Sequence, residues 1–455
     1  MPPGSGATPA DRERSPIVPP AQLELVGEAQ PRRPRSRTAD RQVTVAGLAV
    51  SAGFLASALV AMTLSTSIRL GLWLPVHLVL AGAAGTAIAS VLPFFVVALS
   101  AAAPMSRALR ALAIALVAGG AAAASVGIAA DVHPVAIVGA LSYLVGLGCV
   151  AIAAFWPVRG GLGPRRRLVL AAYGAGLTQV AVGVAIVSLM LAGVPLVVGS
   201  WDLLKPAHAW LNVFGFLSGV VAASLVHLAP TVAGTRIVPR RSSLVALVGL
   251  TVGAPLVALG FALGDDGVAR LGALLETAGA VALVVHAVVV RRDRGVWTTD
   301  PEWHRLTSWS LVAAPAWLLV AVTIAAGRVL WLGAVPAAWS LNGLVAPLII
   351  GWVVQVLIGA WSHLLPAIGP GDMAAHARQR TLLARAAVPR LVALNVGVLM
   401  VVLSEPLGSS VADLLGILLV AAAIVASLVS FVMALTIGRP GGLPRSIAPM
   451  RRGAQ

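Results

Sequence analysis

The sequence predicts an all-α protein, a polytopic transmembrane bundle of about 12 helices with both termini in the cytoplasm. Three observations predict this fold. Of 455 residues, 59% are hydrophobic and 11% are charged, whereas soluble domains have roughly half and roughly a quarter. The apolar residues fall into twelve stretches, and most are long enough to cross a hydrocarbon core of about 30 Å as a helix. The loops between these stretches alternate between arginine-rich and arginine-poor.

The charge of the loops orients the bundle. All but four of the 32 Lys and Arg residues lie in the two terminal tails or in every second loop, and the exceptions are Arg69, Lys205, Arg270 and Arg328. Basic residues near helix ends resist translocation across the membrane, so the side that holds most of the Lys and Arg residues is predicted to be cytoplasmic. The net charge of +16 therefore suits the lipid bilayer with its anionic headgroups, and we expect no nucleic-acid partner. The single cysteine, Cys149, excludes an intramolecular disulfide and a thiolate metal cluster.

The chain divides into three parts. Residues 1–41 mix Pro, Arg, Glu and Ser and are predicted to be a disordered basic cytoplasmic tail, acting either as a docking arm or as a solvated topology anchor. Residues 42–437 form the twelve-span domain, and residues 438–455 form a second cytoplasmic tail. The predominance of Arg over Lys indicates a GC-rich bacterial genome, and hence a multi-pass protein of the bacterial inner membrane.

The twelve spans follow from the apolar stretches and their flanks. Spans 2, 6 and 10 are the longest, so we expect them to tilt or to project past the headgroups. The eleventh is the weakest, because prolines and charged residues crowd both of its ends. The predicted limits are 43–63, 72–100, 107–129, 134–156, 168–192, 205–230, 242–263, 267–290, 306–326, 338–366, 387–403 and 411–437.

Two histidines near the outer ends of spans 2 and 6 are the strongest candidates for a site. His208 and Asn212 are four residues apart and share a helix face, and His77 occupies a similar depth on span 2. Small residues continue both faces inward, at Ala81, Gly85, Gly215 and Gly219. Two imidazoles on neighbouring helices above smooth strips are typical of axial haem ligation. The alternative is that each histidine forms a hydrogen bond with a neighbouring helix.

Four other polar residues within the spans are candidates, since an ionisable or polar group in hydrocarbon needs a partner. His227 and His363 lie near the inner ends of spans 6 and 10, where they form either an inner metal site or favourable helix-end contacts. Glu276 in span 8 serves either in proton relay or substrate recognition, or in an interhelical hydrogen bond as a protonated carboxyl. Gln355 is the midplane candidate on span 10.

Three segments carry a resemblance to a known family. They are HLVLAGAAGTAIASVLPFFVVAL (77–99), HAWLNVFGFLSGVVAASLVHLAPTVAGTRI (208–237) and GWVVQVLIGAWSHLLP (351–366). With the twelve spans, they resemble the haem–copper-oxidase-like membrane domains of actinobacteria, often labelled copper oxidase, and the NnrS-like proteins that contain haem and copper. The resemblance implies haem b or copper bound by His77 and His208. It also implies a role in electron transfer or in nitric oxide or copper handling, with a periplasmic copper or cytochrome redox protein as partner.

The departures from this family limit the function. The sixth helix opens His208-Ala209-Trp210 where the family has His-x-His, and Pro93 stands where a second histidine is common. A respiratory oxidase needs about six ligating histidines, including an adjacent pair, so an intact oxygen-reducing oxidase is excluded. The sequence leaves open whether the protein is an enzyme; if it is one, we expect an oxidoreductase. The alternatives are a secondary transporter with a midplane polar site and a non-catalytic membrane partner of a periplasmic copper enzyme.

Overall fold

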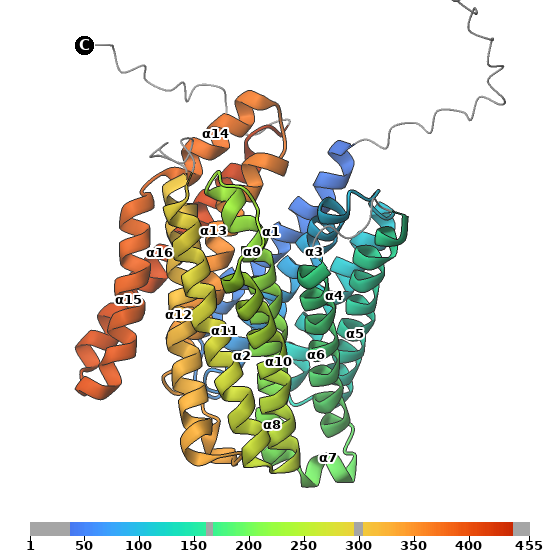
Figure 1. Ribbon diagram of the computed structural model, residues 1–455, viewed down its shortest axis with the longest axis vertical. Helices are drawn as coiled ribbons and strands as arrows, with labels where there is room; N and C mark the ends of the chain where they lie inside the picture. Colours follow the sequence, from blue (N-terminus) through green and yellow to red (C-terminus); the bar gives the residue numbers. More distant parts are fainter. Residues whose placement is uncertain (1–36, 161–166, 295–303, 440–455) are drawn as a thin grey trace, which may run out of the picture. The chain divides into compact units, whose positions relative to one another are not determined.

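The computed structural model describes residues 37–160, 167–294 and 304–439 (Figure 1). Within them, twelve helices are long and apolar enough to cross a membrane, which confirms the all-α polytopic bundle. Large apolar side chains remain exposed along these helices, as contact with a lipid bilayer requires. The tail predicted at 1–41 lies outside the described residues except for the start of α1 at Arg37, and so does nearly all of the tail predicted at 438–455.

The twelve spans keep the predicted order, but the prediction that span 10 is among the longest is wrong: it begins at Val345 instead of near 338 and has 24 residues, because residues 336–338 form a separate 3-10 turn. The spans are α1 (Arg37–Met62), α2–η1–α3 (Trp73–Ser100), α4 (Arg107–Ala129), α5 (His133–Phe155), α6 (Arg167–Leu191), α8–η3–α9 (Trp201–Val232), α10 (Arg241–Leu263), α11 (Asp266–Arg292), α12 (His304–Leu332), η6–α13 (Val345–Ile368), α15 (Ala387–Leu407) and α16 (Ser410–Thr436). Short elements occupy the loops, namely η2 (Trp156–Gly160), α7 (Pro195–Gly199), η5 (Pro336–Ala338) and α14 (Met373–Ala384).

Spans 2, 6 and 10 form the centre of the bundle. In each of them 72–78% of the residues in the most apolar 18-residue stretch are buried, whereas no other span among the described residues exceeds 56%. Each also contains a π-helical segment: η1 (Leu78–Ala84), η3 (Leu211–Ser218) and η6 (Val345–Val354). Such segments are rare and frequently occur at functional sites. η1 contacts both η3 and η6, so the three irregular segments meet in the interior.

Three pairs of consecutive spans form tightly packed hairpins: spans 3 and 4 (α4 with α5), spans 7 and 8 (α10 with α11), and spans 11 and 12 (α15 with α16). Glycines permit this approach, because a Cβ atom on them would collide with the facing backbone. A Cβ on Gly146 would lie 2.8 Å from the backbone nitrogen of Val117, and a Cβ on Gly272 would lie 2.5 Å from the backbone nitrogen of Val257. A Cβ on Gly397 would lie 2.8 Å from the carbonyl oxygen of Gly416. The bundle is therefore built of three similar four-span groups, spans 1–4, 5–8 and 9–12.

An apolar cavity of about 80 Å³ lies between the three central spans and α1. Each central span contributes five residues, at positions i, i+1, i+4, i+5 and i+8. The five begin at Ala87 in span 2, at Val220 in span 6 and at Val356 in span 10. This spacing is one helix face. The repeated register is a second sign that the four-span groups are equivalent.

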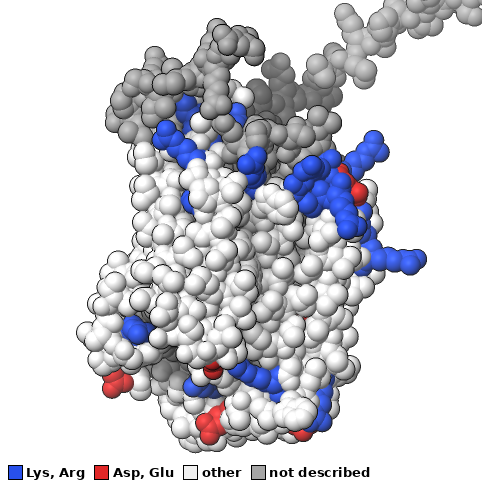
Figure 2. Space-filling model, turned by 90° about the vertical axis from the view of Figure 1, so that its left-hand side faces the viewer, with Lys and Arg blue, Asp and Glu red and all other residues white. Residues whose placement is uncertain are grey.

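The two ends of the bundle differ in charge. Arginines gather near the end formed by the start of α1, by α14 and by the last turn of α16, which we call the basic end (Figures 1 and 2). The four basic residues predicted as exceptions lie in or beside the loops at the opposite end. There Arg270 pairs with Asp266 at 3.5 Å, and Arg328 donates hydrogen bonds to two backbone carbonyls of the following loop.

Candidate functional site

His77 ends the short helix α2 (Trp73–His77), directly before the π segment of span 2. Its Nδ1 lies 2.8 Å from the carbonyl oxygen of Trp73. A carbonyl oxygen only accepts hydrogen bonds, so Nδ1 carries the proton and the lone pair is on Nε2. The Trp73 indole stacks on the imidazole with ring centroids 4.0 Å apart. Trp73 therefore fixes both the tautomer and the orientation of His77.

His208 in α8 (Trp201–Trp210) is held in the same way by a different element. Its Nδ1 lies 2.7 Å from the carbonyl oxygen of Gly183 in α6, which again leaves the lone pair on Nε2. Asn212 donates from its side-chain amide to the His208 carbonyl at 2.7 Å. A Cβ atom on Gly183 would lie 2.5 Å from the side-chain nitrogen of Asn212. The absence of a side chain at Gly183 thus lets α6 come close enough to orient His208.

The structure brings the two histidines together at the arginine-poor end. His77 directly precedes η1 and His208 lies one turn before η3, and these two segments contact each other. Among the described residues, neither Nε2 atom has a hydrogen-bond partner. Histidines that ligate a metal almost always donate their other ring N–H to a carbonyl or carboxylate. Both histidines meet that condition, so each could bind a metal through Nε2.

The small residues predicted to form smooth strips below the histidines are mostly covered. The hydroxyl of Tyr143 packs against Gly85, and the side-chain amide of Gln179 packs against Gly215. Gly219 is different, because it is buried and a Cβ atom there would meet nothing within 4 Å. Two of the glycines therefore serve helix packing, and only Gly219 borders open space inside the bundle.

Glu276 is fully buried in α11 and is linked to the histidine site. Its Oε2 accepts a hydrogen bond of 2.7 Å from the indole N–H of Trp210, two residues after His208. Within the described part of the chain, its Oε1 has no partner. The contact joins two helices, as one of the two alternatives expected, with the carboxyl as acceptor. Its protonated form remains a prediction, as do proton relay and substrate recognition.

Gln355 begins α13 at the end of the π segment of span 10 and is fully buried. Neither atom of its side-chain amide has a hydrogen-bond partner among the described residues. Gly359, one turn further on, faces Ser310 of α12, so Gln355 lies on the side of span 10 that packs against α12. No hydrogen bond joins Gln355 to Glu276 in the described chain.

His227 and His363 lie near the basic end in equivalent positions of spans 6 and 10. The residues that follow them, Leu228 and Leu364, both line the end of the central cavity. The ring of His227 meets Phe95 edge-on, with centroids 6.4 Å apart. Both the inner metal site and the helix-end contacts remain predictions for this pair.

Several residues of the site were not predicted from the sequence. Trp73 had a signal, because it precedes His77 by four residues and shares its helix face. Gly183 had none, because only the packing of α6 against α8 brings its carbonyl to His208. Comparison with protein-family models and with curated protein sequences gives no match for this chain. Fold and site together define an all-α, multi-pass membrane protein with a pair of oriented imidazoles.

Proposed function

We propose that this chain is a membrane haem protein of the bacterial inner membrane, with Nε2 of His77 and Nε2 of His208 as axial ligands of haem b. The observation that supports it most directly is the shared state of the two rings. Each Nδ1 is committed to a backbone carbonyl, and each Nε2 has no partner in the described chain. The rings come from two central spans whose π segments, η1 and η3, contact each other.

The donor set favours haem over a copper ion. The described residues contain no group of three or more His, Cys, Asp or Glu side chains that could hold a metal ion. Tetragonal Cu(II) sites and blue-copper sites use three or more ligands. Haem iron needs only axial ligands from the protein, because the porphyrin supplies the other four nitrogens. Copper bound by His77 and His208 is therefore the second choice.

Haem iron held by both His77 and His208 would suit electron transfer, because no position would be left for a substrate. The site lies at the arginine-poor end, which is the periplasmic side by the distribution of basic residues. A periplasmic copper or cytochrome redox protein is the partner that this position favours. Nitric oxide or copper handling would require a histidine to dissociate or a second protein to supply ligands.

The test is an optical spectrum with metal analysis of the protein purified in detergent from haem-replete cells. We expect a Soret band and about one iron per chain, and we expect His77→Ala and His208→Ala each to remove or shift that band. His133→Ala is the matched control, because His133 lies at the same end and its side chain is 58% exposed. A wild-type protein without a Soret band, or a band unaffected by His208→Ala, contradicts the proposal.

One observation favours a secondary transporter instead. Gln355 buries an amide without a partner among the described residues, next to irregular segments of three central spans, and transporters often place binding sites at broken helices. Flux in proteoliposomes that is lost in Gln355→Leu or Glu276→Gln would support this candidate. Co-purification with a periplasmic copper enzyme, without any bound cofactor, would favour the non-catalytic partner.

A further inference from the structure

A small pocket opens at the basic end between α9, α11 and α12, remote from the histidine pair. Its walls are mostly apolar and include Val232, Val290 and Leu311. Arg291 and Ser308 supply its polar side. The pocket therefore combines apolar walls with a cation and a hydroxyl. These residues lie near the ends of the spans, where a membrane would change from acyl chains to headgroups.

Arg291 is poised for an anion. Its Nε is buried and has no hydrogen-bond partner within the described chain. The guanidinium lies over the ring of Trp309, 5.1 Å from the centroid, and Trp309 is half exposed. Arg305, one turn earlier on α12, is also exposed. Tryptophan at this depth is typical of the membrane interface.

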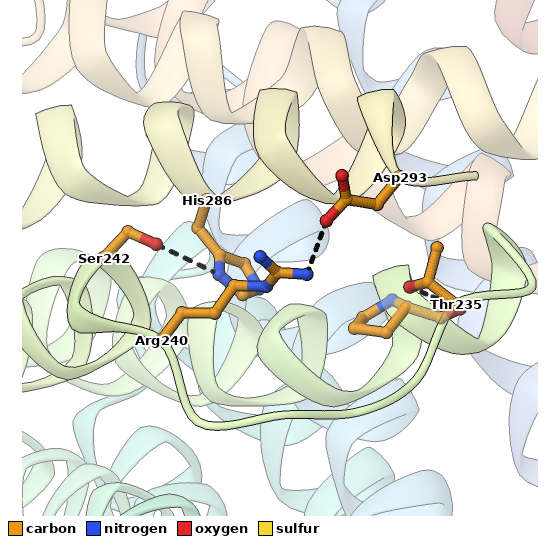
Figure 3. A network of polar contacts seen from close by, with 6 residues as sticks. Thr235, Arg240, Ser242, His286 and Asp293 are labelled. Atoms are coloured by element: carbon orange, nitrogen blue, oxygen red, sulfur yellow. Dashed lines mark hydrogen bonds and ion pairs between the residues drawn. The ribbon is translucent and has the colours of Figure 1, made fainter.

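The acid that directly follows α11, Asp293, forms an ion pair with another residue. Asp293 accepts a hydrogen bond of 2.7 Å from Arg240, at the start of α10 (Figure 3). In the same network the Ser242 hydroxyl lies 3.4 Å from His286 Nδ1. In the described part of the chain, no carboxylate pairs with Arg291. Among the described residues, the pocket's positive charge therefore has no counter-charge.

We propose that this pocket binds the phosphate of an anionic phospholipid from the cytoplasmic leaflet. The Arg291 guanidinium would form charge-assisted hydrogen bonds to phosphate oxygens, and the Ser308 hydroxyl would add another. The pocket itself has room for only about 10 Å³, about one water-sized group, so the acyl chain would lie along the apolar helix surfaces at its mouth. Basic pockets between helices on the cytoplasmic side are suited to anionic headgroups. The choice of a lipid over free phosphate rests on these apolar walls.

Native mass spectrometry of the detergent-purified chain, titrated with phosphatidylglycerol or phosphatidylcholine, tests the site. We expect tighter binding of phosphatidylglycerol, weakened about tenfold by Arg291→Gln, which corresponds to about 1.4 kcal/mol. Gln keeps the length of the side chain and removes its charge. Arg292→Gln is the matched control, since Arg292 is exposed and loses the same charge, and we expect a change below about twofold.

Three results would overturn the proposal. One is equal binding of the two lipids, and another is an equal loss in the two variants, which would indicate a diffuse basic surface. The third is displacement of phosphatidylglycerol by millimolar inorganic phosphate, which would show that free phosphate is the ligand. An unchanged thermal unfolding midpoint for Arg291→Gln separates loss of the site from loss of the fold.

Discussion

The outer ends of spans 2 and 6 differ from the outer end of span 10, although the three spans share a π segment and a cavity-lining face. Spans 2 and 6 place His77 and His208 there, each with Nδ1 bound to a carbonyl. At span 10 the corresponding end has no histidine. Arg328 instead donates to the carbonyls of Ser340 and Asn342, at 2.9 and 2.7 Å.

This difference separates the scaffold from the site. The hairpin glycines and the π segments recur in all three four-span groups, so they belong to the packing of the bundle. The histidines occur at the outer end of only two of the three central spans. Since span 10 ends there without one, the scaffold does not require an imidazole at that place, and the pair needs a separate explanation.

The largest effect is expected from breaking a hairpin. Gly146→Leu places a side chain where even a Cβ atom would lie 2.8 Å from the Val117 amide nitrogen, so α4 and α5 must separate. We expect a loss of about 3 kcal/mol of unfolding free energy or more, measured as a large drop in the thermal midpoint by circular dichroism in detergent. Gly148→Leu on the same helix is the control, because nothing lies within 4 Å there. Similar midpoints for both variants would refute the shared scaffold.

The second prediction concerns the support of His208. Gly183→Ala adds a methyl group 2.5 Å from the side-chain nitrogen of Asn212. Either the Asn212 side chain shifts and loses its hydrogen bond to the His208 carbonyl, or α6 moves away and the contact of its Gly183 carbonyl with His208 Nδ1 lengthens. We expect about 2 kcal/mol of destabilisation. Gly174→Ala on the same helix is the control, because its nearest neighbour is 4.0 Å away. If haem is bound, the Soret maximum of Gly183→Ala should also shift, and an unchanged spectrum and midpoint would deny Gly183 this role.

Much of this fold is predictable from the sequence, because membrane spans depend on local length and hydropathy and orientation depends on loop charge. The positions of His77 and His208 at the same end followed directly from that topology. Their partners did not follow, because the Gly183 carbonyl and the Gln179 amide reach the central span only through the packing of α6. A π segment also leaves no pattern in hydropathy, since it adds a residue to a turn without changing its composition.

A third prediction compares two buried indoles on equivalent spans. Trp210 donates to Glu276, and Trp352 of span 10 donates to the Ser218 hydroxyl at 3.2 Å. Trp210→Phe leaves both oxygens of a buried carboxyl without a partner in the described chain, so we expect a loss of about 2 kcal/mol. Trp352→Phe should cost about 1 kcal/mol, because Ser218 still donates to the Val213 carbonyl. The reverse order in thermal midpoints would mean that Glu276 has another partner.

The smallest effect is expected at Gln355, and it decides between packing and transport. Removing a buried amide that has no partner relieves a desolvation cost, so Gln355→Leu should leave the thermal midpoint unchanged or raise it slightly. A loss above about 1 kcal/mol would reveal a partner. The Leu311 carbonyl of α12 is a candidate, because Pro315 has no N–H to donate to it. An unchanged midpoint combined with lost solute flux would instead mean that the amide is kept for a ligand. In that case span 10 would carry the binding site.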